Sequence, residues 1–161
     1  MNVENEQRVQ RAVELFRSGY NCSQAVLTAF ADAYGLPNDV ALRLSASFGG
    51  GIGRMRQTCG AACGMFMLAG LETGTPDPKD REGKAANYAL VQRLAQEFAR
   101  RNGAINCGEL LGLTRHITAD GVVVEKAERK PKRPCVQIVE EAARIWAEYL
   151  EKRREEGASA P

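Results

Sequence analysis

The sequence contains only one histidine among its 161 residues, His116, and this scarcity excludes several kinds of metal site. A site built from two or more histidines cannot form within the chain. No Cys-x-x-Cys-His segment is present, so covalent haem attachment is excluded as well. Two interpretations of His116 stay open: an exposed loop residue, or the partner of a cysteine in a catalytic dyad.

Long apolar runs and an excess of one charge are also missing. The longest apolar stretch, 65–71, is interrupted by Gly70 and is far shorter than the ~20 residues that span a bilayer. The N-terminal residues lack the apolar centre of a signal peptide. The 22 basic and 20 acidic residues give a formal charge of +2, which does not favour nucleic acid as a partner. We therefore expect a cytoplasmic protein that binds neither nucleic acid nor membranes; its redox partner is undefined and a homodimer is left open.

Helical periodicity dominates a composition that is otherwise ordinary for a globular protein. We predict an all-α fold, a compact single-domain bundle of six to seven helices over residues 1–161, with disordered tails at 1–5 and 155–161. The first helix carries the apolar stripe Val9, Ala12, Val13 and Phe16. The others are expected at about 22–34, 37–47, 59–72, 79–101, 107–111 and 135–152.

Two segments differ from this simple helical pattern. The helix beginning near Cys59 is nearly all small or apolar, so we expect it to be central and closely approached by a neighbour. Residues 114–133 are predicted to form an irregular connection, although Asp120-Gly121 before three valines leaves a small hairpin open.

Four of the five cysteines fall where a helix is expected to begin. Cys22 and Cys107 each follow an asparagine and precede Gln24 or Glu109 in the spacing of a capping box. Cys59 follows Thr58, another good cap, and Cys135 follows a proline, which prefers the first helical position. Unpaired N–H groups at a helix start favour thiolate over thiol. The placement therefore predicts sulfur chemistry.

The fifth cysteine, Cys63, lies one helical turn after Cys59. Their β-carbons would be roughly 5–6 Å apart on one helix face, whereas a disulfide requires about 3.8 Å. A bridge between them needs distortion, whereas shared ligation of a metal does not. Cys63 can equally be a small buried residue. The odd number of cysteines and a reducing cytoplasm disfavour a framework of structural disulfides.

A glycine-rich loop precedes the helix that begins near Cys59. Four of the five residues 49–53 are glycine, and Arg54 and Arg56 follow. Exposed backbone N–H groups in such a loop can hold an anion or cofactor, for which the candidates are Gly50, Gly51, Gly53 and Arg54. No Gly-Lys-Ser/Thr follows, so the loop is not a P-loop. Its alternative role is a tight turn that allows close helix packing.

Four segments and a final cysteine match one known pattern in order. They are Asn-Cys-Ser-Gln-Ala-Val at 21–26, Phe-Gly-Gly-Gly-Ile-Gly-Arg at 48–54, Thr-Cys-Gly-Ala-Ala-Cys-Gly at 58–64, Asn-Cys-Gly-Glu-Leu-Leu-Gly at 106–112, and Cys135. Over about residues 8 to 150 the chain resembles the C_GCAxxG_C_C family, which is named after its cysteines. The resemblance implies a redox role with Cys22, Cys59, Cys107 and Cys135 as the pattern positions. Cys63 stands where a small or hydroxyl residue is expected.

Three functions remain open at this point. The first is a cytoplasmic redox protein, a thiol-dependent oxidoreductase or electron-transfer protein, in which the four pattern cysteines act together and Cys59 is the thiolate. The second is a metal-binding protein in which Cys22, Cys59, Cys107 and Cys135 hold zinc or an iron–sulfur cluster. The third is a helical interaction module with inert cysteines and no cofactor.

Both chemical hypotheses require the same geometry. At least three of the four pattern cysteines must face a shared pocket near the glycine loop at 49–53. Several positive helix ends facing one point would repel each other unless thiolates, an anion or a metal-bound group lay there. Convergence of the sulfurs is therefore the prediction that a structure tests most directly.

Overall fold

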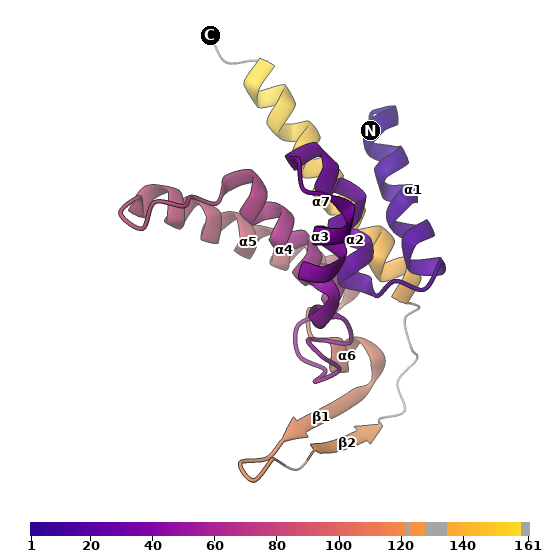
Figure 1. The fold of residues 1–161 in the computed structure, drawn as a ribbon. Coiled ribbons are helices and arrows are strands. Elements are labelled where there is room, and N and C mark those ends of the chain that lie inside the picture. The colour runs from indigo at the N-terminus through magenta and orange to yellow at the C-terminus, as the bar shows by residue number, and fades with distance from the viewer. Residues whose placement is uncertain (122, 128–134, 159–161) are drawn as a thin grey trace.

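The computed structural model describes residues 1–121, 123–127 and 135–158 (Figure 1). Within these residues the chain forms seven α-helices, two short 3-10 helices and one pair of strands, which confirms the all-α fold predicted from the sequence. The elements are α1 Val3–Arg17, α2 Cys22–Ala31, η1 Asp32–Tyr34, α3 Asn38–Ser45, η2 Ala46–Phe48, α4 Gly60–Thr73, α5 Arg81–Asn102, α6 Cys107–Leu111, β1 Leu113–Ile117, β2 Val123–Ala127 and α7 Cys135–Ala158.

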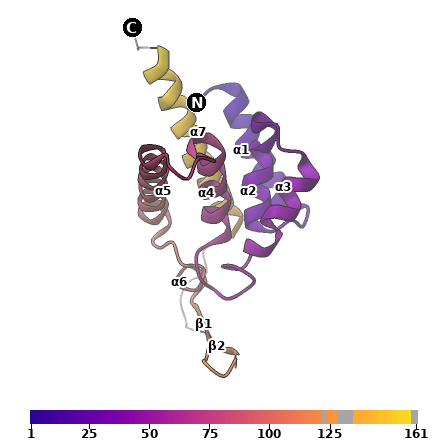
Figure 2. The ribbon, with the colours of Figure 1, turned by 60° about the vertical axis from the view of Figure 1, so that its left-hand side comes forward.

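Two helices form the centre of the bundle. α4 contacts α2, α5 and α7, as expected for its apolar sequence, and α2 packs between α1, α3 and α4. Figure 2 shows α5, α4 and α2 side by side, with α7 behind them. A Cβ atom on Gly64 would lie 2.9 Å from the carbonyl oxygen of Ser23 and 3.0 Å from Cβ of Val26. The small residues of α4 therefore allow the close approach of α2 that the sequence predicts.

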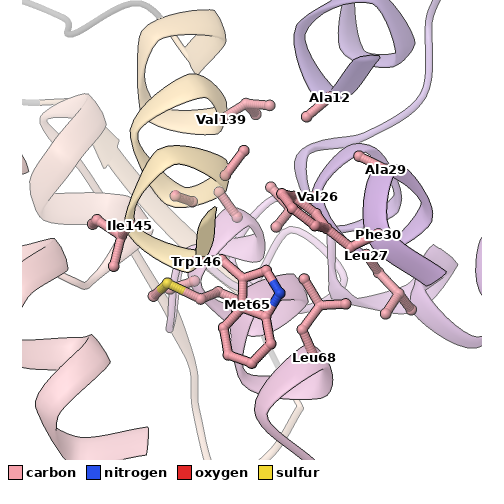
Figure 3. Close-up of a cluster of buried hydrophobic side chains, with 14 of the residues drawn as sticks. Ala12, Val26, Leu27, Ala29, Phe30, Met65, Leu68, Val139, Ile145 and Trp146 are labelled. Atoms are coloured by element: carbon pink, nitrogen blue, oxygen red, sulfur yellow. The ribbon is translucent and has the colours of Figure 1, made fainter. Parts of the chain in front are cut away.

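The core between these helices is built around Trp146 of α7. Trp146 is fully buried, and Figure 3 shows it beside Met65 and Leu68 of α4, with Val26 and Phe30 of α2 nearby. The burial of large side chains from three helices provides the main stabilisation of the bundle.

The buried face of α5 includes Leu90, Leu94 and Phe98 but not Tyr88. Tyr88 has 57% of its surface exposed, whereas Leu90, Leu94 and Phe98 are buried. These three residues follow an i, i+4 spacing that defines the buried stripe. Tyr88 precedes Leu90 by two residues and therefore lies about 200° away around the helix.

The segment predicted as an irregular connection contains the small hairpin that the sequence left open. β1 and β2 pair antiparallel, with Leu113 opposite Ala127 and Ile117 opposite Val123. Figure 1 shows this hairpin extending beyond α6 at one end of the bundle. His116 lies in β1, so its backbone belongs to a strand rather than to the predicted loop. Residues 122 and 128–134 lie outside the described part of the chain.

Most of the described residues in the two predicted disordered tails are helical. α1 begins at Val3 and buries Asn5, and α7 extends to Ala158. The N-terminus is ordered because Glu151 of α7 accepts hydrogen bonds from the backbone N–H of Asn2 and the side chain of Asn5. Of the two predicted tails, residues 159–161 lie outside the described part of the chain.

In the described part of the chain, no helix combines the length and the apolar character that crossing a bilayer requires.

Candidate functional site

All four pattern cysteines line one cavity, as the sequence predicts. Its volume is about 170 Å³, and its other walls include the apolar side chains of Phe16, Leu110, Leu111 and Ile138. Gly50 of the glycine loop and Arg56 also line it. None of the five cysteines forms a disulfide bond. Cysteines that are far apart in the sequence therefore lie around one cavity. A helical interaction module with inert cysteines would not require this arrangement.

The start of α2 positions Cys22. Asn21 and Gln24 form the predicted capping box, each side chain accepting a hydrogen bond from the backbone N–H of the other at 3.0 Å. The same two side chains also donate hydrogen bonds to the next helical segments. Asn21 Nδ2 donates to the carbonyl oxygen of Ala46 in η2 at 2.9 Å, and Gln24 Nε2 donates to that of Leu42 in α3 at 3.0 Å. The cap thus holds Cys22 in the first turn of α2 and fixes that turn to the neighbouring helix.

A short backbone ladder holds Cys59 beside Cys107. The N–H of Cys59 donates to the carbonyl oxygen of Ile105 at 2.8 Å, and the N–H of Cys107 donates to that of Gln57 at 2.6 Å. Cys59 is itself the N-cap residue of α4, so the prediction that Thr58 caps this helix is wrong. The backbone of Thr58 instead pairs with Asn106. This bridge explains the difference, because it keeps Thr58 extended and outside the helix.

The two remaining helix starts complete the arrangement. Asn106 caps α6 as predicted, its side chain accepting from the backbone N–H of Glu109 at 3.0 Å, and Cys107 follows as the first residue of the helix. Cys135 is the first residue of α7, and the proline predicted to start this helix lies outside the described residues. The N-terminal ends of α2, α4, α6 and α7 therefore all reach the cavity.

The glycine loop has a left-handed backbone over most of its length. The residues with φ between 55° and 70° are Gly50, Gly51, Ile52, Gly53, Arg54 and Arg56. Such angles are uncommon outside glycine and strained for a β-branched residue such as Ile52, at a cost of order 1–3 kcal/mol each. Backbone bonds close the loop, including one from the N–H of Gly53 to the carbonyl oxygen of Ser47 at 2.7 Å.

The loop residues predicted to bind a cofactor occupy different positions. Gly50 lines the cavity, and Gly51 packs under Cys107, where a Cβ on the glycine would lie 2.6 Å from the Cβ of the cysteine. Gly53 and Arg54 are exposed to solvent. The arginine that lines the cavity is Arg56. The sequence identified this loop but assigned Arg54, rather than Arg56, as the cofactor-binding arginine. The sequence alone does not show which of the two side chains turns toward the cavity.

Cys22 and Cys59 form a hydrogen-bonded pair that contains one acidic and one basic thiol. The Cys59 thiol donates a hydrogen bond to the Cys22 sulfur, and this bond is the main reason that the pKa of Cys22 falls to about 6. Burial opposes the shift, whereas a hydrogen bond from the backbone N–H of Gly50 adds to it. The same bond and burial raise the pKa of Cys59 well above its ordinary value. Cys22 is therefore the thiolate at neutral pH, which reverses the order predicted from the sequence.

Cys107 and Cys63 have a different electrostatic environment. Burial raises the pKa of Cys107, although Arg56 Nη1 lies 3.7 Å from its sulfur and opposes the shift. Burial also raises the pKa of Cys63 to about 11. The Cys63 thiol lies 3.9 Å from the carbonyl oxygen of Thr58 rather than lining the cavity. Both residues are protonated at neutral pH.

The arrangement of the sulfurs does not fit a four-cysteine metal centre. Within the described residues, no three side chains of His, Cys, Asp or Glu are grouped closely enough to hold a metal ion. A tetrahedral zinc site or a cluster needs four thiolates directed at one point. Here one pair shares a hydrogen bond, and Cys107 faces Arg56.

The chain matches a curated protein and a family model. The chain is 28% identical over 160 residues to a protein of Archaeoglobus fulgidus described as uncharacterized, and the match covers 94% of this chain and 98% of that protein. No solved structure matches the chain. The family model described as "Putative redox-active protein (C_GCAxxG_C_C)" matches residues 20–149, which include all four cavity cysteines. The chain therefore belongs to the C_GCAxxG_C_C family.

Proposed function

We propose that the protein is a thiol–disulfide oxidoreductase in which Cys22 is the nucleophile and Cys59 is the resolving cysteine. The observation that carries this proposal is the hydrogen bond from the Cys59 thiol to the Cys22 sulfur inside a cavity. A nucleophilic thiolate close to a protonated second thiol is the arrangement that disulfide exchange requires. The family's redox description supports the same class of chemistry.

The reaction proceeds in two exchanges. The Cys22 thiolate attacks one sulfur of a substrate disulfide, forming a mixed disulfide and releasing the other half as a thiolate. Cys59 then loses its proton and attacks the Cys22 sulfur, which forms the Cys22–Cys59 disulfide and releases the second half of the substrate as a thiolate. The substrate disulfide gains two electrons, and the protein dithiol loses two electrons and one proton.

The low pKa of Cys22 suits this role. A thiol with a pKa near the ambient pH is the most effective attacking group, because it is largely ionised and keeps much of its nucleophilicity. Cys59 stays protonated while Cys22 is a thiolate. Once Cys22 has formed the mixed disulfide and lost its charge, Cys59 can lose its proton and attack. We propose that Cys107 and Cys135 receive the disulfide from Cys22 and Cys59 by a second thiol–disulfide exchange, because both line the same cavity. A cytoplasmic location would keep all four thiols reduced before reaction.

Thiol counting with peptide mapping tests the proposal. Reduced protein treated with bis(2-hydroxyethyl) disulfide should lose two or four thiols, and the first bridge to appear should join Cys22 to Cys59. Cys63→Ser serves as the control and should form the same bridge, because its thiol contacts Thr58 instead. The proposal fails if no thiol is lost or if the first bridge lacks Cys22. Stoichiometric iron or zinc in anaerobically purified protein would also overturn it.

A further inference from the structure

Among the described residues, Arg56 is the cationic side chain that lines the cavity, and part of its hydrogen-bonding capacity is unused. Its Nη1 reaches the Cys107 sulfur at 3.7 Å, but its Nε is buried and has no hydrogen-bond partner among the described residues. Within that part of the chain, no carboxylate forms an ion pair with Arg56 either. A buried guanidinium N–H without a partner costs free energy, so it requires an explanation such as a ligand.

The charge of Arg56 is not neutralised by the cysteine beside it. Burial favours the protonated form of Cys107, so this neighbour is a thiol rather than a thiolate at neutral pH. Arg56 also keeps a left-handed backbone, with φ of 58°, in the strained loop that closes over the cavity. Arg56 therefore places a positive charge at the wall of the thiol site, and one of its N–H groups has no acceptor among the described residues.

The cavity limits the size of the molecule that can use this donor. Its volume of about 170 Å³ is small beside the roughly 300–1,000 Å³ of pockets that take drug-sized ligands. Phe16, Leu110 and Ile138 supply apolar walls. A short thiol with one acidic group, such as a carboxymethyl thiol with its five non-hydrogen atoms, matches this volume, one charge and apolar surroundings.

We propose that the substrates are small disulfides that carry an anionic group one or two carbons from the sulfur, and that Arg56 binds this group. This inference rests on the proposed function and adds the class of its substrate. A carboxylate or sulfonate would form a charge-assisted, hydrogen-bonded pair with the guanidinium of Arg56. Arg56 also offsets the repulsion between the Cys22 thiolate and an approaching anion.

The chemistry of the step follows from this placement. The Cys22 thiolate attacks the sulfur nearer to the bound anionic group, a Cys22–S bond forms, and the substrate S–S bond breaks. The distal half departs as a thiolate and takes up a proton from solvent. The half that carries the anion stays attached to Cys22 beside Arg56 until Cys59 displaces it. The substrate disulfide is the oxidant, and no other co-reactant is needed.

A charge series of small disulfides tests the inference. The probes are dithiodiglycolate, which is anionic, bis(2-hydroxyethyl) disulfide, which is neutral, and cystamine, which is cationic. The rate at which each consumes the Cys22 thiol is measured by quenched mass spectrometry and divided by its rate with free 2-mercaptoethanol. We expect the corrected rate to be greatest for dithiodiglycolate. Arg56→Gln should lower the ratio of anionic to cationic rates about tenfold, the size expected for one charge-assisted hydrogen bond.

Two further variants separate a local contact from general electrostatics. Arg54→Gln removes the same charge from the same left-handed loop, but Arg54 is exposed, so the ratio should not change. Arg56→Lys keeps the charge and should retain part of the preference. An unchanged ratio in Arg56→Gln, or an equal loss in Arg54→Gln, overturns the inference and leaves disulfide exchange intact. Failure of Cys22 to react with any of the three probes rejects the proposed function itself.

Discussion

The sulfur of Cys22 occupies the space beside Gly60 where a side chain at position 60 would begin. A Cβ atom on Gly60 would lie 2.5 Å from Cys22 Sγ and 2.7 Å from the carbonyl oxygen of Phe48. Cys59 immediately precedes this glycine and donates the hydrogen bond that Cys22 accepts. The absence of a side chain at Gly60 therefore lets the two sulfurs meet, and this glycine belongs to the site as much as to the helix.

Gly60→Ala should disturb both stability and reactivity. The added methyl group would displace Cys22 or the Phe48 backbone, and such overpacking costs about 1–3 kcal/mol. We expect a lower free energy of unfolding and a weaker hydrogen bond between the sulfurs, so the pKa of Cys22 should rise. Urea denaturation and the pH dependence of Cys22 alkylation measure the two effects.

Gly70→Ala is the matched control in the same helix, α4. Gly70 is exposed and no atom lies within 4 Å of a Cβ built there. Because alanine is the better helix former, this change should stabilise the protein by up to about 1 kcal/mol without altering Cys22. If Gly60→Ala and Gly70→Ala had the same stability and the same Cys22 pKa, the close contact at Gly60 would affect neither folding nor the reactivity of Cys22.

The reactivity of Cys22 should follow a titration well below the ordinary pKa of a cysteine. Alkylation requires the thiolate, so its rate should rise with pH through a midpoint at about 6 and level off above it. Cys59→Ala removes the largest cause of this shift. The midpoint should then move upward by about one pH unit or more, toward the ordinary value near 8.5. Iodoacetamide labelling between pH 5 and pH 9, followed by peptide mapping, measures the midpoint.

Cys63→Ala controls for the loss of a thiol from the same helix. Cys63 is one turn beyond Cys59, and its thiol lies near the Thr58 carbonyl oxygen rather than donating to Cys22. Its removal should leave the midpoint of Cys22 where it is in the native protein. A midpoint that stays low in Cys59→Ala would show that the helix start alone, and not the second cysteine, acidifies Cys22.

Features set by neighbouring residues, and the meeting of the four cysteines at one cavity, could be predicted from the sequence, whereas the contacts between side chains inside that cavity could not. The capping box of Asn21 and Gln24 is local and appears as predicted. The choice between Arg54 and Arg56 depends on a left-handed backbone that continues through Ile52, a residue that rarely adopts it. No pattern of residue types signals that continuation. The sequence therefore assigned Arg54 to the cofactor site, whereas the arginine that lines the cavity is Arg56, two positions later.

Long-range contacts also explain the other differences. The residues around Cys59 favour a thiolate, but Cys59 keeps its proton because Cys22, 37 positions away in the chain, carries the negative charge of the pair. Residues 1–5 resemble a disordered tail until Glu151 binds Asn2 and Asn5. Each of these outcomes requires knowing which segments meet, and a helical periodicity shows only which face of a helix is buried.

Trp146→Ala should be the most destabilising single substitution among those considered. The indole is fully buried between α7 and α4, and truncation of a buried tryptophan costs about 3–5 kcal/mol. Trp146→Phe should cost less, because the indole Nε1 has no hydrogen-bond partner among the described residues and its removal sacrifices no bond. Tyr88→Ala, at an exposed position of α5, should change stability by less than about 0.5 kcal/mol. Urea denaturation followed by circular dichroism measures all three, and equal losses at Trp146 and Tyr88 would contradict this assignment of the core.

Two helix caps distinguish a loss of stability from a loss of site geometry. Asn21 caps α2 directly before Cys22, and Asn2 caps α1, each accepting a hydrogen bond from a backbone N–H three residues on. Replacing either by alanine should cost about 1 kcal/mol of unfolding free energy. Only Asn21→Ala also releases the first turn of α2 from Ala46, and so should loosen the position of the Cys22 sulfur. We therefore expect the alkylation midpoint of Cys22 to rise in Asn21→Ala and to stay unchanged in Asn2→Ala. A similar rise in both variants would mean that reactivity follows global stability rather than the placement of the sulfur by its cap.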